Sequence, residues 1–281
     1  MTFLIATCDF PDRADQAAGM WQRLATEFDK SPVDLLILPE LAGVDSFWTS
    51  PTFDETVWRQ AAATHETLEE NLRPIGARRI VGTRAVAEGS RRWNETFLWT
   101  PERGLVRGRA KALLPQQEGG WEETWFDRGS QYPEAVRDGE FCFSEMVCTE
   151  LMVSTAARGL GQSGVQVIAA PRATGGHPRW EVASRMVAIA AGAFVVTANR
   201  RGARLAGGSW IVAPDGDVLA RTNLNAPIVS LEVDLALVAS ARLTYPRNVR
   251  DWRGDLLPGN CAAGRSDQTA RLISLTSTRR P

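Results

Sequence analysis

The side chains of this sequence that are suited to covalent chemistry stand at the ends of predicted strands. A short apolar strand predicted over 143–147 leads to Cys148 and Thr149, and a helix is predicted to begin at Leu151. A sharp turn from a strand into a helix exposes a side chain and leaves backbone N–H groups without helical partners. A thiol at such a turn is a candidate nucleophile beside its own oxyanion hole.

Two charged residues occupy similar positions elsewhere in the chain. The continuous apolar run 33–38 is typical of a strand that is buried on both faces, and it ends in Pro39 and Glu40. Lys111 lies near the end of another predicted strand, 105–112. Since ligand sites of open α/β sheets form at the carboxyl ends of strands, both residues are candidates for the same site as Cys148.

Glu40, Lys111 and Cys148 are the residue types that hydrolysis of a C–N bond needs when no histidine takes part. A thiol is a good nucleophile only as the thiolate, and a carboxylate can take its proton and later give it to the leaving amine. An ammonium group, helped by a backbone N–H such as that of Thr149, would stabilise the tetrahedral oxyanion. Sequence spacing alone does not show that the three side chains converge.

The composition is that of a globular protein with one domain. The chain has 281 residues, of which 44% are hydrophobic and 23% are charged, and its net charge is −1. A basic excess for nucleic acid, an apolar run that could span a bilayer and a signal peptide are all lacking. The four cysteines are irregularly spaced and form neither a disulfide framework nor a CxxC metal site. We expect a soluble, cytoplasmic protein with reduced thiols.

Histidine is scarce, which limits the possible chemistry. The two histidines are His65, in a polar helical stretch, and His177, which follows two glycines. A Cys–His enzyme would have to use one of them, and a histidine zinc site would need more ligands. We expect both to be structural surface residues, with His177 the better candidate for a functional role. No metal site is expected.

Strands and helices alternate along the chain in two halves. The irregular segment between Lys111 and Gly129 is unusually long, and such loops are usually functional. Beyond Tyr245 the sequence becomes polar, so we predict one domain over 1–250 and an arm or tail over 251–281. The remaining expected strands are 2–6, 79–83, 93–99, 165–170, 193–198, 208–212, 218–221 and 228–233, and the expected helices are 15–28, 53–72, 151–160 and 179–191.

Several residues near the predicted site have two interpretations. Glu150 is either a wall of the site or a carboxylate favoured by the dipole at the start of a helix. Arg172 directly follows a predicted strand and is a candidate clamp for a substrate carboxylate. The aromatic residues of the long segment either belong to the core or shape the pocket; they are Trp121, Trp125 and Phe126.

Over about residues 1–250 the sequence resembles the nitrilase superfamily of carbon–nitrogen hydrolases. The segment 34–40 resembles the motif of the family's glutamate general base, 109–115 that of its lysine, and 147–150 that of its cysteine nucleophile. The order Glu, Lys, Cys is the family's order, and Glu122 matches a second glutamate that supports the lysine. Shorter matches are Arg185, Asn199-Arg200, Pro214-Asp-Gly216 and Glu232-Val-Asp234.

This resemblance implies an α/β fold built as a four-layer α-β-β-α sandwich. It implies an amidase-like hydrolase that forms a thioester on Cys148 and releases ammonia or an amine from a small-molecule amide. Glu40 would activate the thiol and then a water molecule, while Lys111 and the Thr149 amide hold the oxyanion. No cofactor is implied, and a homodimer or higher oligomer is expected, paired across the layer that carries the cysteine helix.

Three residues around the nucleophile depart from the family pattern. Ser144 stands where glycine is usual, Glu145 lies in a strand that is normally apolar, and Thr155 replaces a glutamate that many members carry. These departures motivate the alternative of a catalytically silent member that binds a ligand or partner. Hydrolysis of a nitrile or an N-carbamoyl compound, and transfer of the acyl group to another acceptor, are further alternatives. Thr149-Glu150 favours the amidases.

Overall fold

A curled β-sheet runs through the middle of the molecule. The computed structural model describes residues 2–249, and in this part of the chain twelve strands form the sheet. Its two halves meet where β1 pairs in parallel with β11, only over Asp9–Pro11 of β1. The first half contains β1 (Thr2–Pro11), β2 (Leu35–Ile37), β3 (Ile80–Glu88), β4 (Arg91–Thr100), β5 (Gly104–Ala110) and β14 (Ile228–Asp234); the second contains β8 (Val136–Asp138), β9 (Phe141–Glu145), β10 (Val167–Pro171), β11 (Phe194–Arg201), β12 (Trp210–Val212) and β13 (Val218–Arg221).

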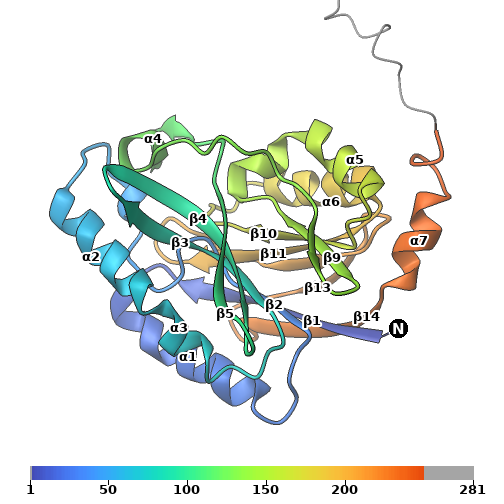
Figure 1. Cartoon of the computed structure of the whole chain (residues 1–281), viewed down its shortest axis with the longest axis horizontal. Coiled ribbons are helices and arrows are strands. Elements are labelled where there is room, and N and C mark those ends of the chain that lie inside the picture. The colour runs from blue at the N-terminus through green and yellow to red at the C-terminus, as the bar shows by residue number, and fades with distance from the viewer. Residues whose placement is uncertain (1, 250–281) are drawn as a thin grey trace, which may run out of the picture. The chain divides into compact units, whose positions relative to one another are not determined.

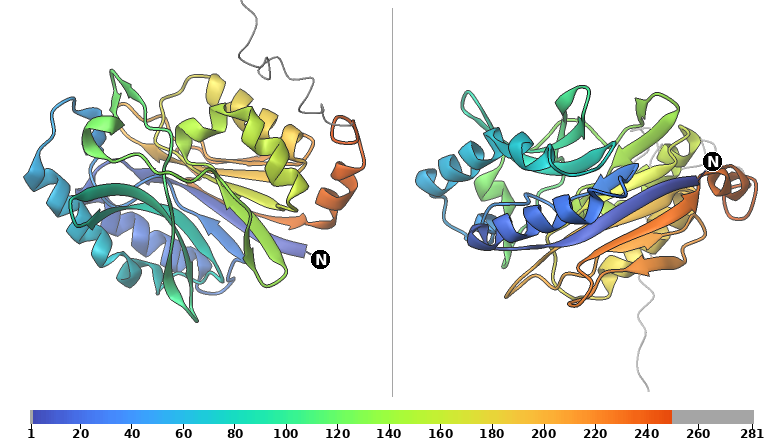
Figure 2. Two further views of the ribbon diagram at one scale, coloured as in Figure 1. Left: turned by 45° about the horizontal axis from the view of Figure 1, so that its top comes forward. Right: turned by 90° about the horizontal axis from the view of Figure 1, so that it is seen from below.

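Helices cover the outer faces of the two halves (Figure 1). In the further views α1 lies against the first half, and α5 and α6 lie side by side over the second (Figure 2). The helices are α1 (Ala14–Phe28), α2 (Glu55–Glu66), α3 (Leu68–Leu72), α4 (Glu122–Trp125), α5 (Ser154–Gln162), α6 (Arg179–Ala191) and α7 (Ala236–Arg242), with the 3₁₀ turns η1 (Phe47–Thr49) and η2 (Cys148–Met152).

Alternation of side chains along the strands produces the layers. In β2, Leu35 and Ile37 point into the core between the two halves of the sheet, whereas Leu36 packs beneath α1 and α3. In β10, Val167 points into the same central core and Ile168 packs beneath α5 and α6. Both strands are therefore buried on two faces, as the continuous apolar run 33–38 predicts for β2. The four-layer α-β-β-α sandwich is confirmed.

Two predicted helices differ from the structure. The helix expected over 53–72 is divided at Thr67 into α2 and α3. The division lets Trp58 of α2 pack among the aromatic residues near the site while Leu72 of α3 packs with α1. The helix expected from Leu151 begins only at α5, because η2 comes first. A further helix, α7, lies in a segment for which the sequence pattern predicts none.

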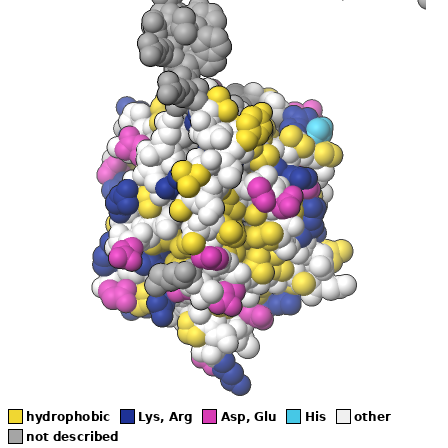
Figure 3. Space-filling view, turned by 90° about the vertical axis from the view of Figure 1, so that its right-hand side faces the viewer, with side chains coloured by type: hydrophobic (Ala, Val, Ile, Leu, Met, Phe, Trp, Pro, Cys, Tyr) yellow, Lys and Arg dark blue, Asp and Glu magenta, His cyan; other side chains and the backbone are white. Residues whose placement is uncertain are grey.

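The outer surface of the described residues carries scattered apolar side chains. Figure 3 looks at the side that carries α7 and shows hydrophobic side chains gathered among charged ones. On α6, Val182 and Met186 are exposed, which is the kind of surface that the expected homodimer requires. That dimer stays a prediction, which light scattering of the pure protein would test.

Two other expectations concern the ends of the chain and the membrane. The predicted arm 251–281 lies outside the described residues. Within residues 2–249, no helix has both the length and the apolar character needed to cross a membrane.

Candidate active site

The strand directions bring the three predicted catalytic residues to one edge of the sheet. β2, β1, β11, β10 and β9 all run parallel, so Glu40 after β2 and Cys148 after β9 leave the sheet at the same edge. β5 is antiparallel to β4, which is antiparallel to β3, and β3 is parallel to β2. Lys111 after β5 therefore arrives at that edge too.

Lys111 is buried between two carboxylates. Its ammonium Nζ donates to Glu40 Oε1 at 2.7 Å and to Glu122 Oε1 and Oε2 at 2.8 and 2.7 Å. Asn94 Nδ2, from β4, also donates to Glu40 Oε1 at 2.7 Å. Glu40 Oε2 is buried and has no hydrogen-bond partner within the described residues. The free oxygen leaves Glu40 able to accept a proton.

The charges of this cluster hold one another in place. Burial disfavours the ammonium, but the carboxylates of Glu122 and Glu40 outweigh it and raise the pKa of Lys111 above its ordinary value. Burial also raises the pKa of Glu122 above its ordinary value, and the neighbouring Lys111 ammonium opposes this rise. Lys111 is thus a permanent cation at neutral pH and is suited to stabilising negative charge, not to removing protons.

Cys148 lies on a strained turn. Its φ of 50° is in the left-handed region, which costs a residue with a side chain about 1–2 kcal/mol. Within residues 2–249, the non-glycine residues with positive φ are Cys148 and Leu41, the neighbour of Glu40. Such strain clusters at functional sites, where the surrounding structure maintains it. The turns that carry Glu40 and Cys148 both show it.

The Cys148 thiol is protonated at neutral pH and therefore needs a base. Burial and, next, the Glu40 carboxylate raise the pKa of Cys148 to about 12, and Lys111 only partly offsets them. Lys111 is hydrogen-bonded to both Glu40 and Glu122, and Glu122 lines the same cavity as Cys148. A thiol beside a carboxylate with a free oxygen is the arrangement that general base activation requires.

A second buried ion pair joins the loop of Lys111 to the loop of Cys148. Glu150 accepts hydrogen bonds from both Nη atoms of Arg109, from Ala112 N at 2.9 Å and from Val147 N at 2.8 Å. Burial opposes the charge, but Arg109 lowers the pKa of Glu150 below its ordinary value. Glu150 therefore lies beneath the site and holds the start of η2, and it does not line the cavity.

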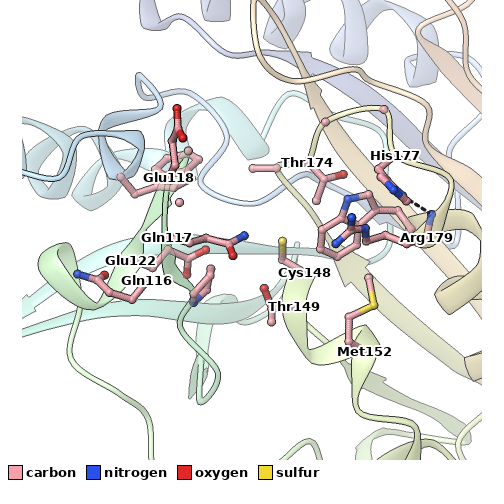
Figure 4. A pocket seen from close by; sticks show the side chains of 18 residues that line it. Gln116, Gln117, Glu118, Glu122, Cys148, Thr149, Met152, Thr174, His177 and Arg179 are labelled. Carbon is pink, nitrogen blue, oxygen red and sulfur yellow. Dashed lines mark hydrogen bonds between the residues drawn. The ribbon is translucent and has the colours of Figure 1, made fainter. Parts of the chain in front are cut away.

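The site opens into a cavity of about 570 Å³. Cys148, Thr149 and Glu122 form its floor, and Figure 4 shows Gln117 and Glu118 on one wall with His177 and Arg179 on the other. The first wall is a hairpin of β6 (Gln116–Gln117) and β7 (Gly120–Trp121) inside the segment expected to be irregular.

Two of the three aromatic residues of that segment belong to the core, whereas Trp121 of β7 is half-buried. Trp125 and Phe126 are buried with Phe47 and Trp58, and Trp125 Nε1 donates to Ser50 O. These two rings therefore do not line the cavity, which was the alternative interpretation. Trp48 of η1, which the sequence analysis did not select, contacts the same cluster and also lines the cavity.

Arg172 is buried outside the cavity wall. Its guanidinium donates to Thr174 Oγ1, Thr197 Oγ1 and Gly208 O, and it stacks 4.1 Å from the centre of the Trp210 ring. The structure therefore does not bring this side chain to the place that a clamp for a substrate carboxylate needs. Its backbone does contribute, because Arg172 O accepts the N–H of Glu40 and links two strand ends.

His65 corrects another expectation, since it is buried instead of lying on the surface. Its Nδ1 accepts from Ala85 N at 2.8 Å, and its Nε2 lies 3.0 Å from Ala42 O. Burial lowers the pKa of His65 to about 4, so the ring is neutral and donates from Nε2. It is structural, as expected, and ties β3 to the loop that follows Glu40.

The residues that depart from the family pattern lie around the site and not in its cavity. Ser144 is buried and Thr155 is exposed, and neither lines the cavity. Glu145 is buried beside Arg109, which donates to its backbone oxygen at 2.7 Å. Burial raises the pKa of Glu145 to about 7, against the lowering effect of Arg109.

A comparison with known protein families identifies the family of this chain. The model of the family described as carbon-nitrogen hydrolase matches residues 5–243, and the chain belongs to this family. This match confirms the resemblance to carbon–nitrogen hydrolases, and solved structures confirm the fold. A comparison with curated protein sequences found no match.

Three solved structures illustrate the likeness of fold. The carbon-nitrogen hydrolase from Helicobacter pylori G27 has a TM-score of 0.80 and 18% identity, over 91% of this chain and 97% of that one. The amidase from Nesterenkonia sp. has a TM-score of 0.70 and 21% identity, over 88% and 95%. A mutant of the Nesterenkonia sp. AN1 amidase (0.70, 20%, over 85% and 92%) shows covalent addition of the acetamide moiety of fluoroacetamide at its active-site cysteine.

Proposed function

We propose that this carbon–nitrogen hydrolase is an amidase that converts a small amide into a carboxylic acid and ammonia or an amine. The observation that carries the proposal is the free Glu40 Oε2 beside a Lys111 cation and a strained Cys148 thiol in one site. This set supplies a base, an oxyanion stabiliser and a nucleophile. The covalent adduct on the cysteine of the Nesterenkonia amidase supports the same use of the thiol.

The first half of the reaction forms a thioester. Glu40 Oε2 takes the thiol proton as Cys148 Sγ attacks the carbonyl carbon, and the carbonyl oxygen becomes an oxyanion. The Lys111 ammonium and the Thr149 N–H stabilise that charge. The proton on Glu40 then passes to the nitrogen, the C–N bond breaks, and the amine leaves.

The second half regenerates the enzyme. Glu40 removes a proton from a water molecule as its oxygen attacks the thioester carbon, and the same donors stabilise the second oxyanion. When the C–S bond breaks, the thiolate recovers the proton from Glu40 and the acid leaves. One water is consumed, and the protein ends in its starting protonation state.

Glu122 has a specific part in this scheme. Within residues 2–249, the hydrogen bonds from Lys111 Nζ go to Glu40 and Glu122, and two of them reach the same Glu122 carboxylate. An ammonium has three donors, so one of this pair can turn toward the oxyanion while the other keeps Lys111 in place. Glu122 is therefore a positioning residue in the proposal, and the structure's close Lys111–Glu122 contacts support it.

Ammonia release from a panel of amides, nitriles and N-carbamoyl compounds tests the function. We expect the amides to be hydrolysed, with an acyl-enzyme detectable by intact mass after rapid quenching. Cys148→Ala should abolish both ammonia release and the mass increase while circular dichroism shows an unchanged fold. Full activity in a folded Cys148→Ala variant, or turnover of nitriles alone, would overturn the proposal.

A further inference from the structure

An arginine without an ion-pair partner lies on one wall of the active-site cavity. Arg179 lines the cavity together with His177, opposite Gln117 and Glu118, and Cys148 lies between the two walls (Figure 4). Within residues 2–249 the Arg179 guanidinium has neither a hydrogen bond nor an ion pair; only its backbone N–H is bound, to His177 Nδ1. Its charge is therefore available to a ligand.

The stability of the fold does not account for this cation. Arg179 is the first residue of α6, and a positive charge at the start of a helix is unfavourable. The acidic residue of the first turn, Glu181, is already paired with Arg221 at 3.1 Å and lies 3.9 Å from Arg185. Arg179 is thus an uncompensated cation beside a nucleophile.

The rest of this wall also favours an anion. The segment 173–180 contains no acidic residue. His177 Nδ1 accepts a hydrogen bond from the Arg179 N–H, so a neutral His177 carries its proton on Nε2 and presents a donor. The opposite wall has Glu118, whose carboxylate would repel an anion turned the wrong way. The two walls are therefore of opposite electrostatic character.

We infer that Arg179 selects amides whose acyl part carries a carboxylate, such as the monoamide of a short dicarboxylic acid. The guanidinium binds the carboxylate and thereby orients the amide carbon toward Cys148. This inference rests on the proposed amidase function. It assigns to Arg179 the role that the sequence analysis considered for Arg172, whose guanidinium is held in the interior by Thr174, Thr197 and Gly208.

Three amides of similar size and different charge test the inference. Succinamate is anionic, pentanamide is neutral, and γ-aminobutyramide is cationic, and ammonia release gives kcat/KM for each. We expect succinamate to be preferred over pentanamide, and γ-aminobutyramide to be the poorest substrate.

The selectivity ratio, kcat/KM for succinamate over that for pentanamide, isolates the contribution of Arg179. Arg179→Gln should lower this ratio by about 10- to 100-fold, the usual worth of a hydrogen bond to a charged group, mainly through a higher KM for succinamate. Arg179→Lys should restore part of it. Arg23→Gln is the matched control, because Arg23 is an exposed arginine on α1, far from the cavity lining, and should leave the ratio unchanged.

Each result has one meaning. Equal or better turnover of pentanamide, or a ratio that Arg179→Gln leaves unchanged, overturns the inference while the amidase function stands. If the unaltered protein hydrolyses none of the amides, including those of the wider panel, the proposed function fails and this inference fails with it.

Discussion

The molecule contains two buried carboxylates, Glu150 and Glu40, whose hydrogen bonding differs in kind. Their cation partners, Arg109 and Lys111, are neighbours in the chain on either side of Ala110. Each Glu150 oxygen accepts two hydrogen bonds, one from Arg109 and one from a backbone N–H of Ala112 or Val147. In Glu40, Oε1 accepts from Asn94 and Lys111 while Oε2 has no partner within residues 2–249.

This difference separates a positioning group from a reacting one. A buried polar atom without a partner is unfavourable, and among the described residues Glu40 Oε2 is the one carboxylate oxygen in this state. The saturated Glu150 has no lone pair left for a proton and fixes the two loops that carry Lys111 and Cys148. The open oxygen of Glu40 is the place in the site where a proton can go.

The largest effect on activity is expected from Glu40→Gln. The amide side chain keeps the size of the carboxylate but cannot take a proton from Cys148, so kcat/KM should fall by about 10²- to 10⁴-fold. Urea unfolding should show a smaller loss of stability than loss of the Glu150 charge causes, because Lys111 keeps Glu122 as its counter-charge. Glu88→Gln, at an exposed carboxylate of β3, is the control and should retain activity. Near-normal turnover by Glu40→Gln would show that another group is the base.

Glu150→Gln should have the reverse profile, with a smaller effect on chemistry and a large one on stability. The change leaves the buried Arg109 guanidinium without its counter-charge, and breaking a buried pair typically costs about 3–5 kcal/mol. The free energy of unfolding in urea measures this loss. Activity should be compared without denaturant, at a temperature at which both proteins are folded. Unchanged stability with abolished activity would mean that Glu150 takes part in the reaction.

Some residues of the site could be predicted from the sequence, and others could not. Glu40, Lys111 and Cys148 were predictable because each follows a recognisable strand, and parallel strand ends meet at one edge. Asn94 was missed because it lies inside a strand, where alternation usually places polar residues toward solvent. Which of the two roles Glu150 has depends on Arg109 and Ala112, which are 41 and 38 residues away in the chain. Sequence spacing does not give the distance between these groups in space.

The other misses share a physical cause. Arg172 and Arg179 are both polar residues in one strand-to-helix connection, and only the fold decides which guanidinium turns inward and which lines the cavity. His65 lies in a polar helical stretch, so its burial depends on the contacts of α2 with Ala42 and Ala85. Tertiary packing, and not local pattern, settles these positions.

The smallest expected effect concerns Glu145. Folding raises the pKa of this carboxyl, whereas folding lowers the pKa of Glu150. A carboxyl with a folded-state pKa of about 7 binds its proton more tightly in the folded protein than in the unfolded chain, where the pKa is about 4.3. Its contribution to stability is complete below pH ~4 and is lost as the pH rises through 7. Glu150 behaves in the reverse way, and its contribution is lost as the pH falls through its lowered pKa.

Glu145→Gln removes the titration while keeping the shape of the side chain. The difference in stability, variant minus unaltered protein, should therefore rise by on the order of 2–3 kcal/mol when the pH is raised from 5 to 8. Urea unfolding of both proteins at the two pH values measures the difference, and effects of all other titrating groups cancel in it. A difference that stays constant, or one that grows toward low pH, would place an ionised Glu145 in the folded protein and make it a second partner of Arg109 alongside Glu150.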